Sequence, residues 1–139
     1  MKYTYERKIN YYETDKMGVV HHSNYIRFLE EARCYWLESL GMPFASFEEN
    51  DVTIPVLEVN CTYKHHVTFG DTLLINVIVK EYSGVRMTVS YEVLNKETNQ
   101  PIIFAETKHC FTNRNLKPIN LKKYIPEYDE KFRKLKAEN

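Results

Sequence analysis

The sequence predicts an α+β fold in which an antiparallel β-sheet accompanies one long helix. Apolar residues recur at helical spacing between Tyr25 and Leu40, which indicates an amphipathic helix. Between Val85 and Val93, apolar and polar residues alternate, which is typical of a strand with one buried face. The expected order is a strand, the long helix, about four strands and a small helix. With 139 residues, we expect a single domain spanning 1–139.

The first strand is expected over residues 3–11, where the residues alternate in polarity. Arg7 is the one charged residue that interrupts the apolar phase of this strand. A loop should follow from Glu13 to Gly18, because this stretch mixes polarities and contains a glycine. The apolar phase of the strand comprises Tyr3, Tyr5, Ile9 and Tyr11.

The long helix should begin near Ser23 or Asn24, since both residue types favour the N-cap position. Gly41 should end it, and Pro43 follows directly beyond. At about 1.5 Å per residue, such a helix is roughly 25 Å long. It is the one long amphipathic helix expected in the main body, so it is the natural element for a sheet to wrap.

The second half of the chain should supply the rest of the sheet. Phe44–Asp51 has the character of a polar connection. The apolar phase changes between Pro55 and Leu57, which predicts a bulge or a break between two strands. The tail, 113–139, should contain a short helix that begins at Pro126. Strands that suit an antiparallel meander are expected at 73–79, 85–93 and 102–112.

Charge and composition narrow the possible functions. Nineteen basic and nineteen acidic residues cancel, so no basic surplus indicates a nucleic-acid partner. Three widely spaced cysteines argue against a disulfide framework and favour a reducing compartment. The N-terminus lacks the apolar run of a signal peptide, and no apolar segment approaches the length of a membrane span. We therefore expect a cytoplasmic protein without a membrane span.

Neither a metal nor another cofactor is expected. The paired histidines at 21–22 and 65–66 lack the spacing of zinc ligands, because adjacent residues of a strand point to opposite sides. The glycine-rich motifs that bind nucleotides do not occur in the sequence.

A carboxylate beside the start of the long helix is the strongest candidate for chemistry. Asp15 should lie in the loop after the first strand, shortly before the helix amides between His22 and Tyr25. A carboxylate can activate water or attack a carbonyl, and helix amides can stabilise a developing oxyanion. By spacing alone, a loop aspartate more often serves a turn or an N-cap.

The same stretch resembles a known family in three blocks: Tyr11-Tyr12-Glu13-Thr14-Asp15, Gly18-Val19-Val20 and His22-Ser23-Asn24-Tyr25. This signature is similar to that of hotdog-fold acyl-CoA thioesterases in the 4-hydroxybenzoyl-CoA thioesterase superfamily, nearest to the branch of Tol–Pal-associated thioesterases. The similarity extends more loosely to about Thr112. It implies the hotdog fold, in which the sheet curls around the long helix.

The resemblance also implies catalytic roles. Asp15 would be the general base or the nucleophile, and His22 would orient water, contact the thioester or tune Asp15. Tyr11 would donate a hydrogen bond in the same site. The alternatives are a histidine that packs at the helix start and a strand tyrosine that simply packs.

Substrate contacts are expected at two places. The backbone amides from His22 to Tyr25, those of Ser23, Asn24 and Tyr25 included, are candidate oxyanion donors, because helix geometry leaves them without intrahelical partners. Some relatives carry a basic cluster for coenzyme A phosphates before the strand that should begin at Val85. Here only Arg86 could take its place.

Three acidic residues have other interpretations. Another class of hotdog thioesterases carries its catalytic carboxylate on the long helix, where this chain has Glu30 and Glu31. We interpret both as helix-surface or interface residues, since Asp15 is present. Glu58 lies in an otherwise apolar strand, so it should be an edge or cavity-lining residue.

The resemblance implies an acyl-CoA thioesterase that hydrolyses a thioester to a carboxylate and a free thiol. The donor would be coenzyme A or an acyl-carrier protein. At least a homodimer is implied, and tetramers are common in the family. The alternative is a non-catalytic acyl-thioester or acyl-carrier-protein binding module, since fold does not determine function. A hotdog dehydratase would need its histidine and carboxylate arranged differently.

Overall fold

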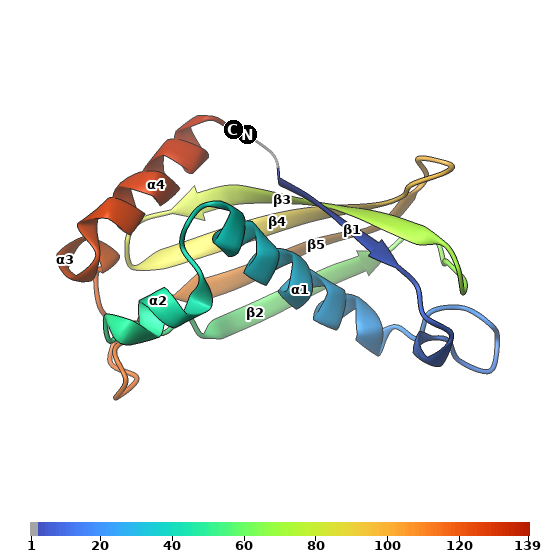
Figure 1. The fold of residues 1–139 in the computed structure, drawn as a ribbon, viewed down its shortest axis with the longest axis horizontal. Helices are drawn as coiled ribbons and strands as arrows, with labels where there is room; N and C mark the ends of the chain where they lie inside the picture. The colour runs from blue at the N-terminus through green and yellow to red at the C-terminus, as the bar shows by residue number, and fades with distance from the viewer. Residues whose placement is uncertain (1–2) are drawn as a thin grey trace.

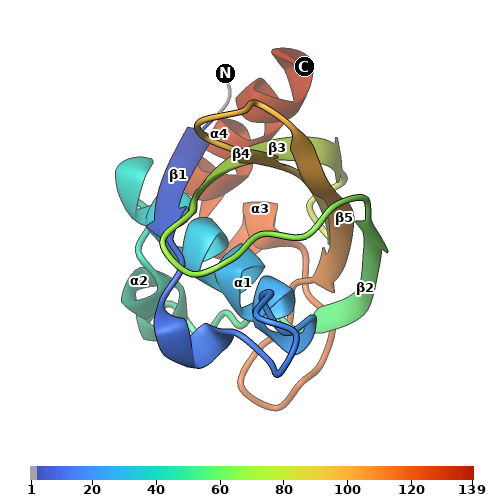
Figure 2. The same ribbon diagram turned by 90° about the vertical axis from the view of Figure 1, so that its right-hand side faces the viewer.

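Residues 3–139 are described by a computed structural model, in which a five-stranded antiparallel sheet holds one long helix. The strand order across the sheet is β1-β3-β4-β5-β2. The elements give the predicted α+β class, and in Figure 2 the sheet curves around α1, as the resemblance implied. The strands are β1 (Tyr3–Lys8), β2 (Val56–Tyr63), β3 (Thr72–Tyr82), β4 (Arg86–Asn95) and β5 (Pro101–Cys110).

The helices of the described chain differ greatly in length. The long helix α1 crosses the inner side of the sheet, and α4 lies at the end of the sheet where β3 turns into β4 (Figure 1). The helices are η1 (Tyr11–Glu13, a 3₁₀ helix), α1 (Ser23–Ser39), α2 (Phe44–Glu49), α3 (Leu121–Tyr124) and α4 (Pro126–Ala137).

One face of α1 forms the centre of the hydrophobic core. Phe28, Leu29, Ala32 and Trp36 are all at most 2% exposed and recur at helical spacing. They share one core with the alternating buried residues of β3 and β4. Burying a large apolar side chain stabilises the fold by about 1.5–3 kcal/mol. This packing fixes where the helix begins, at the loop that follows β1.

The first strand is shorter than predicted, because it ends at Lys8. The Ile9 amide still donates to the Asp71 carbonyl at 2.8 Å, and the chain then turns into η1. The Glu13 carboxylate accepts the Asn10 amide at 2.8 Å, which stabilises this turn. The strand position predicted for Tyr11 was therefore wrong.

The start and end of α1 match the prediction better than its cap does. The helix begins at Ser23, but neither Ser23 nor Asn24 is the N-cap. His22 takes that position with helical backbone angles (φ −55°, ψ −28°) and no capping hydrogen bond from its side chain. At the other end Gly41 has φ +76°, a conformation that favours glycine, so its predicted role as the helix stop is confirmed.

Besides η1, two short α-helices were not predicted from the sequence. The supposed polar connection Phe44–Asp51 contains α2, which is anchored by Phe47 at 1% exposure. The four-residue α3 precedes the predicted tail helix α4, which does begin at Pro126. The predicted bulge is confirmed by a register shift between Val56 and Glu58, where β2 pairs with β5.

A chain of polar side chains crosses the core between α1 and the sheet. Arg33 Nη1 donates to the Tyr91 hydroxyl at 3.1 Å, and that hydroxyl lies 2.7 Å from Thr107 Oγ1. Thr107 Oγ1 in turn lies 2.7 Å from His109 Nε2. Burial, followed by the charge of Arg33, lowers the pKa of His109 to about 4, while the Pro55 backbone acts in the opposite direction. His109 is therefore neutral in the folded protein near pH 7.

This buried histidine should make stability depend on pH. In the unfolded chain His109 takes up a proton near pH 6.5, whereas the folded protein resists protonation until about pH 4. The contribution of His109 to the free energy of unfolding is therefore fully present above pH 6.5, and it is lost as the pH falls toward 4. A shift of this size corresponds to about 3 kcal/mol.

We expect His109→Gln to flatten the dependence of the unfolding free energy on pH in this window, as measured by urea denaturation. His65→Gln removes an exposed histidine and serves as the control. A slope that is the same in His109→Gln and the wild type would contradict the assignment.

Candidate active site

The loop between β1 and α1 folds back on itself as a short antiparallel ladder. The Asp15 amide donates to the Val19 carbonyl at 2.8 Å, and the His21 amide donates to the Glu13 carbonyl at 2.9 Å. Gly18 closes the turn with φ +80°, which a glycine adopts without strain. The ladder brings Asp15 close to the residues that lead into α1.

Asp15 lies at the tip of this ladder and is half-buried. Its Oδ1 accepts the Met17 amide at 2.8 Å, which fixes the orientation of the carboxylate. Within residues 3–139 no partner is recorded for Oδ2, so this oxygen is available to water or to a bound molecule. The aspartate thus makes the turn bond expected of a loop aspartate and keeps one free oxygen for chemistry.

The amides at the start of α1 are already partly occupied. Asn24 N and Tyr25 N donate to the carbonyls of His21 and His22, at 2.9 and 3.3 Å. Ser23 N donates to His21 Nδ1 at 3.2 Å, a bond that breaks when the His21 ring rotates. Within residues 3–139 the His22 amide alone among these four has no recorded acceptor. The available oxyanion donors are therefore His22 N and, conditionally, Ser23 N.

A cavity of about 300 Å³ opens beside this helix start, between α1 and the end of β2. It has aromatic walls, Tyr25 and Tyr63, whose ring centroids lie 5.7 Å apart. Burial raises the pKa of Tyr25 to about 12, so its hydroxyl keeps its proton. The remaining lining residues are Val20, His22, Lys64, His65 and His66.

Asp15 does not itself line this cavity, although Val20, which is bridged to its neighbour Thr14, does. A larger hollow, of about 450 Å³, lies over the outer face of the sheet. It is lined by strand residues, many of them outward-facing such as Ser90 and Glu106, and by no residue of α1 or of the loop before it. The smaller cavity is therefore the better candidate for substrate.

Comparison with known proteins gives the family. Residues 9–132 match the family described as the thioesterase-like superfamily. This chain belongs to that superfamily. A putative acyl-CoA thioesterase, YneP, from Bacillus subtilis is 28% identical over 94% of this chain and 95% of its own length.

Solved thioesterase structures agree in fold. A DHNA-CoA thioesterase from Staphylococcus aureus superposes with a TM-score of 0.92 at 31% identity, over 98% of this chain and 91% of that one. A 1,4-dihydroxy-2-naphthoyl-CoA thioesterase from Synechocystis superposes with a TM-score of 0.81 at 26% identity, over 87% and 90%. The predicted hotdog fold and the predicted class of enzyme, a thioester hydrolase, are confirmed. The finer placement in the Tol–Pal-associated branch stays a prediction.

Most of the predicted site residues of this thioesterase lie together around the helix start. Asp15, His22 and Tyr25 come from adjoining turns of the loop and α1. The Asn24 side chain contributes differently from its expected amide role, because its Nδ2 donates to the Glu13 carbonyl at 2.8 Å. The Ser23 hydroxyl lies 2.8 Å from His21 Nδ1.

The other two predicted residues do not line the cavity, although the Tyr11 carbonyl accepts the Thr14 amide of the same loop at 3.1 Å. Tyr11 is 75% exposed, makes an edge contact with Phe69 at 5.6 Å between ring centroids, and does not line the cavity. Arg86 begins β4, next to the end of β3, whereas the loop with Asp15 lies near the start of β3 (Figure 1). Since β3 has 11 residues, roughly 35 Å separates these places. Within one chain, Arg86 and Asp15 are not brought together.

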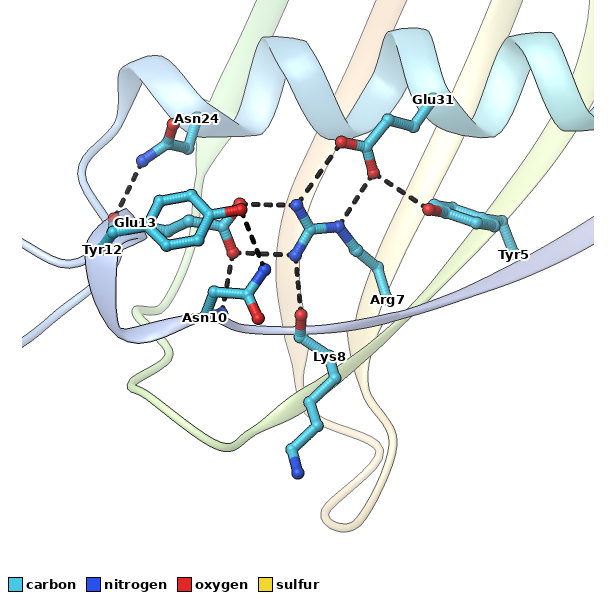
Figure 3. A network of polar contacts seen from close by, with 8 residues as sticks. All are labelled: Tyr5, Arg7, Lys8, Asn10, Tyr12, Glu13, Asn24 and Glu31. Carbon is cyan, nitrogen blue, oxygen red and sulfur yellow. Dashed lines mark hydrogen bonds and ion pairs between the residues drawn. The ribbon is translucent and has the colours of Figure 1, made fainter.

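An ion-pair cluster around Arg7, which includes Glu13 of the same loop as Asp15, was not predicted from the sequence. Arg7 lies between Glu13 and Glu31, at 2.5 Å from a Glu13 oxygen and 2.8 Å from a Glu31 oxygen (Figure 3). Glu31, predicted to be a helix-surface or interface residue, is thus partly buried and paired with an arginine of β1. Glu30 and Glu58 are exposed, and Glu58 lies on the edge strand β2 as one prediction had it. An arginine in the apolar phase of a strand was the available signal, because a buried charge needs a partner.

Neither metal binding nor a membrane-spanning helix is supported by the described residues. Among residues 3–139, no group of three or more His, Cys, Asp and Glu side chains could hold a metal ion. None of the helices there is long and apolar enough to cross a membrane.

Proposed function

We propose that this protein hydrolyses acyl-CoA thioesters with Asp15 as the general base or nucleophile and the start of α1 as the oxyanion site. The observation that carries the proposal is the free Oδ2 of Asp15 on a ladder that leads directly to the His22 amide. The names of the relatives support coenzyme A as the thiol carrier. They also favour aromatic acyl groups, above all 1,4-dihydroxy-2-naphthoyl, as the first to test.

Two routes lead from this geometry to the same products. As a base, Asp15 takes a proton from water, and the resulting hydroxide adds to the thioester carbonyl. As a nucleophile, a carboxylate oxygen adds to that carbonyl, the thiolate leaves, and water then hydrolyses the mixed anhydride. In both routes the carbonyl oxygen becomes negative, and the His22 amide would stabilise it. The acid is released, and the thiolate takes up a proton.

The cavity beside His22 suits the substrate in size and character. Its aromatic walls, Tyr25 and Tyr63, would hold an acyl group by apolar contact. Lys64 lines the same cavity and would favour the anionic coenzyme A over a neutral thioester.

Replacing Asp15 with Asn should abolish most of the activity while the fold is retained, because the amide can neither take a proton from water nor attack efficiently. We expect kcat to fall by about 10²–10⁴-fold. The measurement is free-thiol release from a panel of acyl-CoAs that includes 1,4-dihydroxy-2-naphthoyl-CoA, benzoyl-CoA and short, medium and long alkanoyl-CoAs.

Asp51→Asn is the matched control, since Asp51 is also a loop aspartate whose carboxylate accepts a backbone amide, that of Arg114 at 2.9 Å. It should keep wild-type activity. Equal activity in Asp15→Asn and the wild type would remove Asp15 from the mechanism. A wild type that binds acyl-CoA but turns over neither acyl-CoA nor acyl-carrier protein would favour the binding module.

We also propose that the protein acts as a homodimer that forms along β2. This strand is an edge of the sheet, and it exposes several apolar side chains there. Exposed edge strands with apolar residues are typical sites of strand pairing between chains. Tyr63 belongs both to this edge and to the cavity, so a second copy would lie against the substrate site. The exposed apolar residues of β2 are Val56, Leu57, Val59 and Tyr63, at 38–49% exposure.

A charge on this edge should separate the subunits. We expect Val59→Arg to elute as a monomer in size-exclusion chromatography with light scattering, because the buried arginine would have no partner. Thr4→Arg, on the opposite edge strand β1, should leave the dimer intact. A wild type that is monomeric at micromolar concentration would contradict the proposal.

A further inference from the structure

One guanidinium group ties together the three elements that surround the candidate site. Arg7 projects from β1, Glu13 ends η1, and Glu31 lies on α1 (Figure 3). The arginine side chain is 14% exposed and the Glu13 side chain 5%, while that of Glu31 is 34% exposed. The cluster is thus largely shielded from water, where charge-assisted hydrogen bonds are strong.

Arg7 uses every donor that it has. Nη1 donates to Glu13 Oε1 and to the Lys8 carbonyl, both at 2.7 Å. Nη2 donates to Glu13 Oε2 at 2.5 Å and more weakly to Glu31 Oε2 at 3.4 Å, and Nε donates to Glu31 Oε1 at 2.8 Å. The guanidinium also stacks over the Phe28 ring, 4.6 Å from its centroid. Only a planar fork with five N–H groups makes this pattern, and a lysine ammonium has three donors and no fork.

Glu13 connects Arg7 to the loop that carries Asp15 through its own hydrogen bonds. Its carboxylate accepts the Asn10 amide, where the loop leaves β1. Its carbonyl accepts the His21 amide at 2.9 Å and Asn24 Nδ2 at 2.8 Å, where the loop returns and α1 begins. Asp15 lies two residues further on, in the same ladder. The position of the Glu13 backbone therefore sets the distance from Asp15 to the first turn of α1.

We propose that Arg7 is a positioning residue for thioester hydrolysis, which holds Asp15 in register with the start of α1 through Glu13. The inference rests on the proposed function of Asp15. The nucleophile must reach the carbonyl carbon while the oxyanion donors bind the oxygen of the same carbonyl, so a displacement of about 1 Å can cost about 10²-fold in rate. A cluster that contributed only to stability would leave this register, and hence kcat, unaffected in any variant that folds.

Arg7→Lys is the sharpest test, because lysine keeps the positive charge between the two carboxylates but cannot hold both in a fixed orientation. We expect kcat for the best acyl-CoA to fall by about tenfold or more, with KM within about threefold, because the register changes and the cavity does not. The melting temperature should stay within a few degrees of the wild type. Activity within about twofold of the wild type would overturn the inference.

Arg133→Lys is the matched control. Arg133 pairs with the buried carboxylate of Asp129 at 2.9 Å and lies over the Tyr82 ring, 5.3 Å from its centroid. Like Arg7 it combines a carboxylate partner with an aromatic ring, but its side chain is 49% exposed against 14% for Arg7, and it lies on α4, at the other end of the molecule (Figure 1). It should keep wild-type kcat and KM. An equal loss in Arg133→Lys would assign the effect to general destabilisation and overturn the inference.

Glu13→Gln provides a second variant in case Arg7→Lys does not fold. It leaves Arg7 and Glu31 as a balanced pair, so the charge in the cluster stays compensated. Glutamine has one acceptor oxygen where glutamate has two, so the bidentate bond to Arg7 is lost. We therefore expect kcat to fall as in Arg7→Lys. Full activity in a folded Glu13→Gln would count against the role assigned to Arg7.

A double-mutant cycle with Asp15→Asn separates this inference from the proposed function. If Arg7 acts through Asp15, the double variant should be no less active than Asp15→Asn alone, within about twofold. Independent, multiplicative losses would show that Arg7 acts elsewhere and would overturn the inference while the function stands. An active Asp15→Asn would overturn the function, and the positioning role with it.

Discussion

The structure depends on the burial of one face of α1 against the curved sheet. The helix has four near-fully buried positions on that face, from Phe28 to Trp36, and each large apolar side chain among them contributes about 1.5–3 kcal/mol by leaving water. No other described helix presents a comparable apolar face to the inner side of β3 and β4. Because the helix is fixed along its length, its first turn has a fixed place, and the loop that carries Asp15 is built onto that end.

Apolar packing does not by itself fix how the helix is rotated about its axis. Two polar clusters on its flanks add that constraint. Glu31 meets Arg7 toward β1, and Arg33 meets Tyr91 toward β4. A slip by one residue would rotate the helix by about 100° and leave both charges without their partners, and an unpaired buried charge is strongly destabilising. The position of the first-turn amides around the helix axis is therefore set by side chains about two turns further along.

The sequence predicts the parts of this thioesterase whose signal is local. Alternation between Val85 and Val93 and the helical spacing from Tyr25 to Leu40 each follow from burial of one face, and both elements are present. The first strand was extended too far, because alternation continues through Ile9 while a hydrogen bond from the Asn10 amide to Glu13 already turns the chain. The short α2 escaped notice because Phe47 is its one buried residue.

The candidate site was predictable to the extent that it is contiguous. Asp15, His22 and Tyr25 lie within one loop and the helix turn that follows, so their order in the chain implies their proximity. Arg86 shows the limit, since alternation indicates a strand but not the end of the sheet at which that strand begins. The Arg7 cluster shows another limit, because its carboxylates lie 6 and 24 residues away, and no local pattern selects them.

The exposed edge of β2 connects the two proposals about substrate and assembly. Its inward-facing residues pair across the sheet with buried positions of β5, such as Val59 with Thr107, yet Val59 remains 38% exposed because no element within residues 3–139 covers this edge. The helix α1 fills the sheet from β1 to β4 and leaves the side of β2 open. Tyr63, at the end of β2, lines the cavity. Covering the edge with a second copy would remove apolar surface from water and narrow the cavity in the same step. In this proposal the wall of the acyl pocket and the subunit interface are one surface, so changes in β2 should alter assembly and substrate range together.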